Sequence, residues 1–206
     1  AQEGSRWYLV DPDGYAFIST GVDVCSPYSA GLLTDIMPLF ENLPDEKEFD
    51  AAYNGGEHNR PGKYLSHLTA NLMKAYGADW EEKWQRLTVS RLNKWKFNTI
   101  GNWSNPAFIR VAAKPYVWPL EDFPGTEVNI FRDFPDVFSK EYEKNSEIFA
   151  RQLKPFSGDP FMIGYFLRNE PAWAFVHGLL IADKVMENPA PTACRNSLIQ
   201  RLQEKY

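Results

Sequence analysis

The sequence has few cysteines, few histidines and no long hydrophobic run. It contains two Cys and three His among 206 residues, and Cys25 and Cys194 lie near opposite ends of the chain. This pattern offers neither the spacing of a metal site nor a disulfide framework. We therefore expect no cofactor and no metal ion, and two small thiols that are buried as hydrophobic side chains. Because no apolar run approaches the roughly 20 residues of a membrane-spanning helix, we expect no membrane partner.

The charge and the aromatic content narrow the class of protein further. The net charge is −5 and the Lys and Arg residues are scattered, which argues against a nucleic-acid partner. Hydrophobic residues make up 44% of the chain, enough for a large core. Seven Trp and ten Tyr are compatible with carbohydrate binding. Aromatic rings stack on the faces of sugars, although ordinary packing explains any single ring at least as well.

Short apolar runs alternate with segments of helical periodicity along the chain. The runs predict strands at 6–10, 16–22, 97–103, 114–120 and 161–167, the first two joined by a turn at 11–14. The helical spacing predicts helices at 63–77, 79–95, 137–153 and 173–186, and a last helix that Thr192 caps. Residues 26–62 are interpreted as a long insertion and residues 123–135 as a loop. Four strand–helix units in this order predict an α/β protein with a parallel sheet.

The last of these strands ends at a carboxylate. The apolar run at 161–167 leads into Arg168-Asn169-Glu170-Pro171-Ala172-Trp173. A proline cannot continue a central strand, so the strand stops close to Glu170. In an α/β barrel the C-terminal ends of the strands carry the chemistry, which favours Glu170 as a catalytic acid. The alternative is a glutamate at a strand end that caps a helix.

Residues 163–173 resemble the fourth-strand signature of the clan A glycoside hydrolases. They are most similar to the agarase-like members, glycoside hydrolase family 50, and to the related family 42 β-galactosidases. Residues 6–23 and 91–104 resemble the barrel entry and the second strand of the same group, in the right order. The resemblance implies a (β/α)8 TIM barrel and a retaining glycosidase that hydrolyses β-linked galactose-containing poly- or oligosaccharides. It also implies Glu170 as general acid/base and Asn169 as a hydrogen-bond donor to the sugar 2-hydroxyl, where a turn residue is the alternative.

Four further residues are candidates for contact with the carbohydrate substrate. Asn102 and Trp103 end the second strand and would face the same mouth of the barrel, while packing is an alternative role for Trp103. Asp23 ends the first strand, where it would bind a sugar hydroxyl or form a structural ion pair. Trp173 lies three residues after Glu170. For Arg168 a structural ion pair is the favoured interpretation.

The resemblance also implies a second carboxylate, because in that clan a glutamate at the end of the seventh strand is the nucleophile. No segment of this sequence matches that site. Glu121 and Asp122 are the local candidates, but their surroundings are typical of a solvated loop. We therefore expect residues 1–206 to be the N-terminal half of a catalytic barrel, with about four of its βα units. Its partner would be a second half-barrel chain or a second copy in a homodimer. The alternative function is a non-catalytic carbohydrate-binding or structural fragment that lacks the nucleophile.

Overall fold

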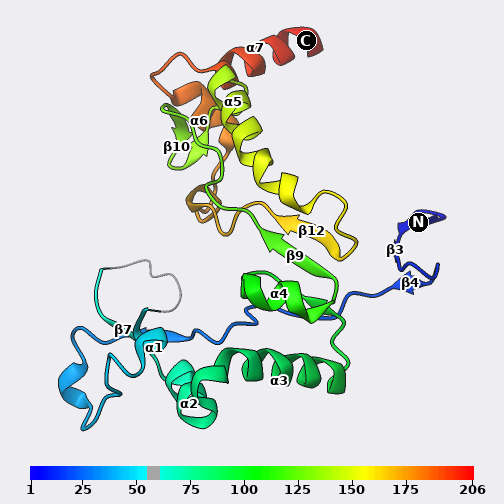
Figure 1. Ribbon diagram of the computed structural model, residues 1–206. Helices are drawn as coiled ribbons and strands as arrows, with labels where there is room; N and C mark the ends of the chain where they lie inside the picture. The colour runs from blue at the N-terminus through cyan, green and yellow to red at the C-terminus, as the bar shows by residue number, and fades with distance from the viewer. Residues whose placement is uncertain (55–60) are drawn as a thin grey trace. The chain divides into compact units, whose positions relative to one another are not determined.

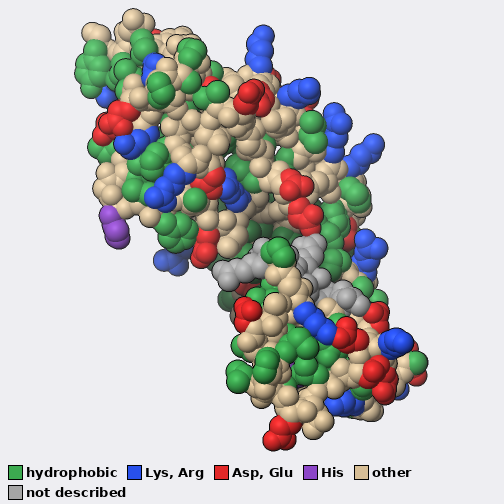
Figure 2. Space-filling model, turned by 90° about the vertical axis from the view of Figure 1, so that its left-hand side faces the viewer, with side chains coloured by type: hydrophobic (Ala, Val, Ile, Leu, Met, Phe, Trp, Pro, Cys, Tyr) green, Lys and Arg blue, Asp and Glu red, His purple; other side chains and the backbone are tan. Residues whose placement is uncertain are grey.

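The computed structural model describes residues 1–54 and 61–206 and has a mixed α/β architecture (Figure 1). The chain forms two compact units, Ala1–Tyr116 and Val117–Tyr206. On the face shown in Figure 2, acidic and basic side chains are interspersed, and apolar side chains reach the surface between them. In the described part of the chain, no helix is both long and apolar enough to span a membrane.

A parallel sheet forms in the first unit, as the alternation of strands and helices predicts. β5 (Gly21–Val22) pairs in parallel with β8 (Thr99–Ile100). β8 in turn pairs in parallel with β9 (Tyr116–Pro119), through Ile100 and Tyr116. The strands lie where the apolar runs place them, but each is shorter than its run.

The strand predicted at 16–22 is divided in two. β4 (Ala16–Phe17) pairs antiparallel with β3 (Leu9–Val10), which confirms the hairpin across the turn at their connection. Beyond β4, the Asn98 side chain accepts a hydrogen bond from the N–H of Thr20 (2.8 Å). It also donates to the carbonyl of Ile18 (2.9 Å). The carbonyl of Thr20 also accepts from the backbone N–H groups of Asn98 (2.9 Å) and Thr99 (3.2 Å), so both main chain and side chain of Asn98 hold the segment between β4 and β5. A further hairpin at the N-terminus consists of β1 (Gln2–Glu3) and β2 (Arg6–Trp7).

Two helices supply the core beside β8. α3 (Trp80–Lys94) confirms the helix predicted there, and its Trp84 packs on Phe108 with ring centroids 5.1 Å apart. Phe108 is fully buried on α4 (Pro106–Ala112). α4 begins where Asn105 accepts a hydrogen bond from the N–H of Phe108 (2.9 Å), an N-cap that satisfies one of the first-turn donors.

The prediction of one helix over 63–77 is wrong at its start. β7 (Tyr64–Ser66) pairs antiparallel with β6 (Ala30–Leu32). α2 (His67–Tyr76) begins only after Ser66, whose side chain accepts a hydrogen bond from a first-turn N–H. The apolar residues of the strand continue the spacing of the helix, so periodicity alone does not separate the two. A 3₁₀ helix, η2 (Gly77–Asp79), connects α2 with α3.

The segment at 26–62, interpreted as an insertion, contains two short helical elements besides β6, and the second of them contacts β7 and α2. They are η1 (Met37–Leu39), a 3₁₀ helix, and α1 (Asp50–Asn54), while residues 55–60 lie outside the described residues. The buried side chains of this region form one hydrophobic cluster: Leu33, Phe49, Ala52, Tyr53, Leu65 and Ala70.

In the second unit, β9 lies beside β12 (Met162–Phe166), the strand predicted to carry the site. The N–H of Leu120 donates to the carbonyl of Phe166 (2.9 Å). The helix predicted before β12 is present as α5 (Lys140–Ala150), which continues as the 3₁₀ helix η3 (Arg151–Phe156).

The prediction of a loop over 123–135 is wrong at its end, where a small hairpin forms. β10 (Asn129–Phe131) pairs antiparallel with β11 (Phe134–Pro135) across Arg132 and Asp133. These strands are too short to show an alternating pattern in a sequence rich in proline and acidic residues. Ile130 is buried and anchors the hairpin in the core of the unit.

The prediction of a helix over 173–186 is also wrong in its first half. Only a 3₁₀ turn, η4 (Ala172–Ala174), follows Pro171, and α6 (Ile181–Glu187) begins later. Gly178, with φ +68°, interrupts the helical backbone between them. The last helix, α7 (Ala193–Lys205), starts at Thr192 as predicted. Its Cys194 joins a hydrophobic cluster with Ile130, Val185, Phe134, Val137, Ile181 and Leu198.

Candidate functional site

The chain turns sharply at Glu170 after leaving β12. Glu170 has φ +38°, in the left-handed region that non-glycine residues seldom adopt. Pro171 follows with an extended backbone and precedes η4. Asn169 and Glu170 are both exposed. The predicted acid therefore stands at a strand end in an unfavourable backbone conformation, a feature that occurs preferentially at functional sites.

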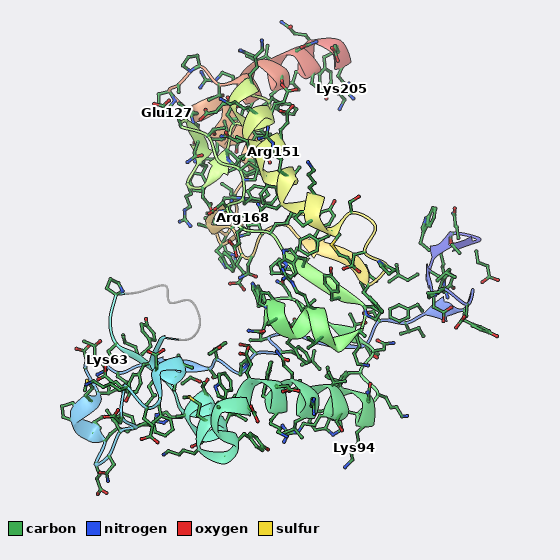
Figure 3. All side chains as sticks on the ribbon, in the orientation of Figure 1. Lys63, Lys94, Glu127, Arg151, Arg168 and Lys205 are labelled. Carbon is green, nitrogen blue, oxygen red and sulfur yellow. The ribbon has the colours of Figure 1, made fainter. Side chains whose placement is uncertain are left out.

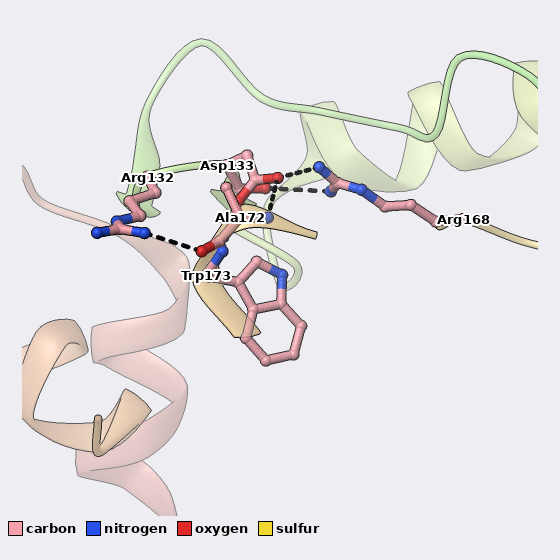
Figure 4. Close-up of polar contacts among 5 residues, drawn as sticks. All are labelled: Arg132, Asp133, Arg168, Ala172 and Trp173. Atoms are coloured by element: carbon pink, nitrogen blue, oxygen red, sulfur yellow. Dashed lines mark hydrogen bonds and ion pairs between the residues drawn. The ribbon is translucent and has the colours of Figure 1, made fainter. Parts of the chain in front are cut away.

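One carboxylate from the β10–β11 hairpin holds this turn on both sides. Asp133 accepts hydrogen bonds from the N–H of Ala172 (2.9 Å) and from the N–H of Trp173 (3.0 Å), and it forms an ion pair with Arg168 (Figure 4). Arg168 also donates to the backbone carbonyl of Asp133 (3.3 Å). Arg168 extends from the segment that follows β12 (Figure 3). Arg168 thus forms an ion pair, and its partner is a carboxylate that also contacts the turn after Glu170.

Asp133 has a lowered pKa. Partial burial would by itself raise the pKa, but hydrogen bonds from the N–H groups of Ala172 and Trp173 and the charge of Arg168 outweigh it. The carboxylate is consequently ionised at neutral pH and holds its partners as an anion.

Trp173 packs against the same hairpin. Its ring meets that of Phe134 edge to face, with centroids 5.2 Å apart. The neighbouring Ala172 is held from its carbonyl side by Arg132 (3.0 Å). Beside Trp173 lies a cavity of about 220 Å³, lined by Phe123, Phe134, Tyr142, Leu167, Arg168 and Trp173 among others.

In the first unit, the ends of β5 and β8 are joined by a side chain. Oδ1 of Asp23 accepts a hydrogen bond from the backbone N–H of Asn102 (2.8 Å). Gly101 makes this approach feasible, because a Cβ atom there would lie 1.8 Å from that oxygen. Two predicted site residues, Asp23 and Asn102, are therefore brought together by a hydrogen bond.

Asn102 is the least satisfied polar residue of this region. It is 4% exposed, and within the described parts of the chain neither its Nδ2 nor its Oδ1 has a hydrogen-bond partner. Buried side-chain amides are nearly always hydrogen-bonded, so an unpaired one calls for an explanation. The next residue, Trp103, is exposed with φ +56°, so the chain also turns in the left-handed region directly after Asn102.

The predicted site residues thus form two groups. Asp23, Asn102 and Trp103 lie in the first unit, and Asn169, Glu170 and Trp173 in the second. Glu121 and Asp122 are both exposed. Among the described residues, no three His, Cys, Asp or Glu side chains gather closely enough to hold a metal ion.

Sequence reasoning missed two residues that shape these groups. Asp133 lies in the segment interpreted as a loop, and no local pattern links it to Glu170. Gly101 did carry a signal, because an isolated glycine in a strand often marks a close approach of other atoms.

Comparisons with known proteins give a consistent picture. No protein-family model matches the chain. Beta-agarase A of Vibrio sp. (strain JT0107) is 27% identical over 195 residues, which cover 83% of this chain and 19% of that protein. Beta-agarase B of the same strain is 25% identical over an alignment of 240 residues, and the match covers 98% of this chain and 25% of that protein. The chain thus spans about a fifth to a quarter of the length of these relatives.

Three solved structures share the fold. An agarase, AgWH50C, has a TM-score of 0.78 at 24% identity, and the match covers 98% of this chain and 34% of the AgWH50C chain. PfGH50B has a TM-score of 0.68 at 28% identity, over 84% of this chain and 29% of its own. An exo-beta-agarase has a TM-score of 0.75 at 21% identity, over 100% of this chain and 36% of its own. The chain is therefore agarase-like in sequence and fold. The resemblance to the agarases of glycoside hydrolase family 50 is confirmed.

Proposed function

We propose that this chain is part of a retaining glycoside hydrolase that cleaves β-linked galactose-containing polysaccharide, such as agar. The observation that carries the proposal is its similarity to Beta-agarase A and Beta-agarase B across most of its length. We further propose that it forms the N-terminal half of a (β/α)8 barrel, with residues 26–62 as an insertion between its first two strands. The parallel pairs β5–β8 and β8–β9 support this architecture.

In the proposed reaction Glu170 is the general acid/base. It donates a proton to the glycosidic oxygen as the bond to the leaving sugar breaks, while a second carboxylate attacks the anomeric carbon. Glu170 then removes a proton from the water that releases the glycosyl group. The exposed position of Glu170 at the end of β12, within a turn held by Asp133, supports this role.

The remaining predicted residues are proposed to bind the sugar. Asn169 would donate to the 2-hydroxyl. Asn102 would hydrogen-bond hydroxyl groups through a buried amide that offers two donors and an acceptor and has no partner among the described residues. Asp23 would contribute its carboxylate, and Trp103 and Trp173 would stack on sugar faces.

The decisive experiment compares Glu170→Gln with the wild type in the full-length product of the gene. The assay is release of reducing ends from agarose, together with hydrolysis of an aryl β-galactoside. Loss of general acid/base catalysis should lower the agarose rate by about 10²–10⁴-fold. Glu147→Gln, the same change at an exposed position of α5, is the matched control and should retain full activity. Normal agarose hydrolysis by Glu170→Gln would refute the assignment.

The same activity assay, combined with a measurement of oligosaccharide binding, distinguishes the proposed hydrolase from a non-catalytic carbohydrate-binding protein. A wild-type product that binds agaro-oligosaccharides but releases no reducing ends would be a carbohydrate-binding protein. Hydrolysis of the aryl β-galactoside without hydrolysis of agarose would instead indicate a β-galactosidase-like enzyme.

A further inference from the structure

We propose that Asp133 is the positioning residue of the Glu170 turn, so that a carboxylate outside the reacting pair decides where the general acid/base stands. This proposal rests on the proposed function of Glu170. Asp133 is not next to Glu170 in sequence but lies at the tip of the β10–β11 hairpin.

The contacts of Asp133 bracket the turn from both ends. Before Glu170, the carboxylate pairs with Arg168. After it, Oδ2 accepts from the N–H of Ala172 (2.9 Å) and Oδ1 accepts from the N–H of Trp173 (3.0 Å). One carboxylate therefore contacts the Arg168 side chain and the backbone N–H groups of Ala172 and Trp173 (Figure 4). The backbone of 169–171 runs between these contacts.

The conformation of Glu170 makes such bracketing necessary. A φ of +38° is unfavourable for a residue with a Cβ atom, and such conformations persist only where the surroundings over-determine them. The hairpin supplies a second constraint, because Arg132 donates to the carbonyl of Ala172 (3.0 Å). Without the Asp133 carboxylate, the segment would lose the ion pair before Glu170 and both N–H bonds after it, whereas the bond from Arg132 to Ala172 would remain.

The same contacts argue against a direct catalytic role for Asp133. Both of its oxygens accept bonds from N–H groups of the turn, and its charge is paired with Arg168. Its lowered pKa keeps it ionised at neutral pH, so it does not serve there as the proton donor. Asp133 therefore acts through the geometry of Glu170.

The test uses Asp133→Asn in the full-length gene product, with Asp183→Asn, an exposed position of α6, as the matched control. Hydrogen exchange of the peptide over 168–174 reports the turn, and two substrates report the chemistry. Agarose needs the general acid. A dinitrophenyl β-glycoside of the same sugar, with azide as acceptor, needs neither acid nor base.

We expect exchange of the turn in Asp133→Asn to accelerate at least tenfold. The kcat for agarose should fall at least tenfold while KM changes less than threefold, and the rate with the dinitrophenyl glycoside and azide should stay within threefold of the wild type. Equal losses with both substrates, unchanged agarose turnover, or unchanged exchange would each overturn the proposal.

A second variant covers the case in which Asp133→Asn does not fold. Arg168→Gln leaves both N–H bonds to Asp133 in place and should lower kcat for agarose several-fold, whereas Arg168→Lys should restore most of it. Unchanged kcat in Arg168→Gln would then overturn the proposal.

If Glu170→Gln is inactive and the Asp133 and Arg168 variants are fully active, only the positioning role fails. If Glu170→Gln itself is fully active, the proposed function fails as well.

Discussion

Replacing Gly101 by alanine should destabilise the first unit through one identifiable clash. The new Cβ atom would lie 1.8 Å from Oδ1 and 3.0 Å from Cγ of Asp23, far inside van der Waals contact. The Asp23 side chain must then rotate away and give up its 2.8 Å hydrogen bond to the N–H of Asn102. A hydrogen bond to a charged group contributes about 1.5–3 kcal/mol. Because Asp23 is exposed, we expect a loss of about 2 kcal/mol in the free energy of unfolding.

Thermal and urea unfolding followed by circular dichroism measure this loss. For a chain of this size about 2 kcal/mol corresponds to a fall in Tm of about 4–8 °C. Gly31→Ala is the matched control, since no described atom lies within 4 Å of a Cβ atom built there, and it should change the stability little. In a double-mutant cycle, Asp23→Ala should remove most of the penalty of Gly101→Ala, because the clashing atom is gone. Strictly additive costs, or a Gly101→Ala variant as stable as Gly31→Ala, would refute the reasoning.

Three further predictions follow from the packing and the electrostatics. Phe108→Ala, at a fully buried position against Trp84, should cost about 3–5 kcal/mol in urea unfolding, and a cost below about 1 kcal/mol would contradict the described core. Burial, followed by the hydrogen bond to Asp136, raises the pKa of Cys194 to about 11, so at pH 8 iodoacetamide should modify it far more slowly in the native protein than in urea. The pKa of Asp133 is lowered on folding, so its stabilising contribution is complete above its unfolded pKa of about 3.9 and is lost as the pH falls through the lower folded value. A ¹³C NMR titration of its carboxyl group, with a midpoint at or above about 3.9, would contradict this.

Local sequence signals located most of the elements. The Thr192 hydroxyl caps α7, and Gly77, whose backbone adopts a positive φ readily, ends α2, as the sequence predicts. These signals act between residues a few positions apart, within one turn of helix or one hairpin. The wrong helix boundaries arose because these signals are so short in range. Apolar residues of β7 continue the spacing of α2, and those near Gly178 mimic a helix that the glycine interrupts.

For the candidate site residues too, the sequence predicted local features but not the contacts that depend on packing. The motif Asn169-Glu170-Pro171 marks the end of a strand by sequence alone, and the resemblance that it carries is confirmed by the comparisons. The exposure of Glu170 and the burial of Asn102 could not be read from the sequence, because exposure depends on which segments pack nearby.

The sequence by itself determined the α/β class, the agarase-like character and the carboxylate at the end of β12, because these rest on composition, local patterns and motifs. Only the tertiary structure decided that Asp133 holds the turn of Glu170 and that Asp23 binds the backbone of Asn102. The hydrogen bond partners are 40 residues apart for Asp133 and Trp173, and 79 apart for Asp23 and Asn102. Contacts at such separations form only when whole strands and hairpins have packed, so no local rule specifies them.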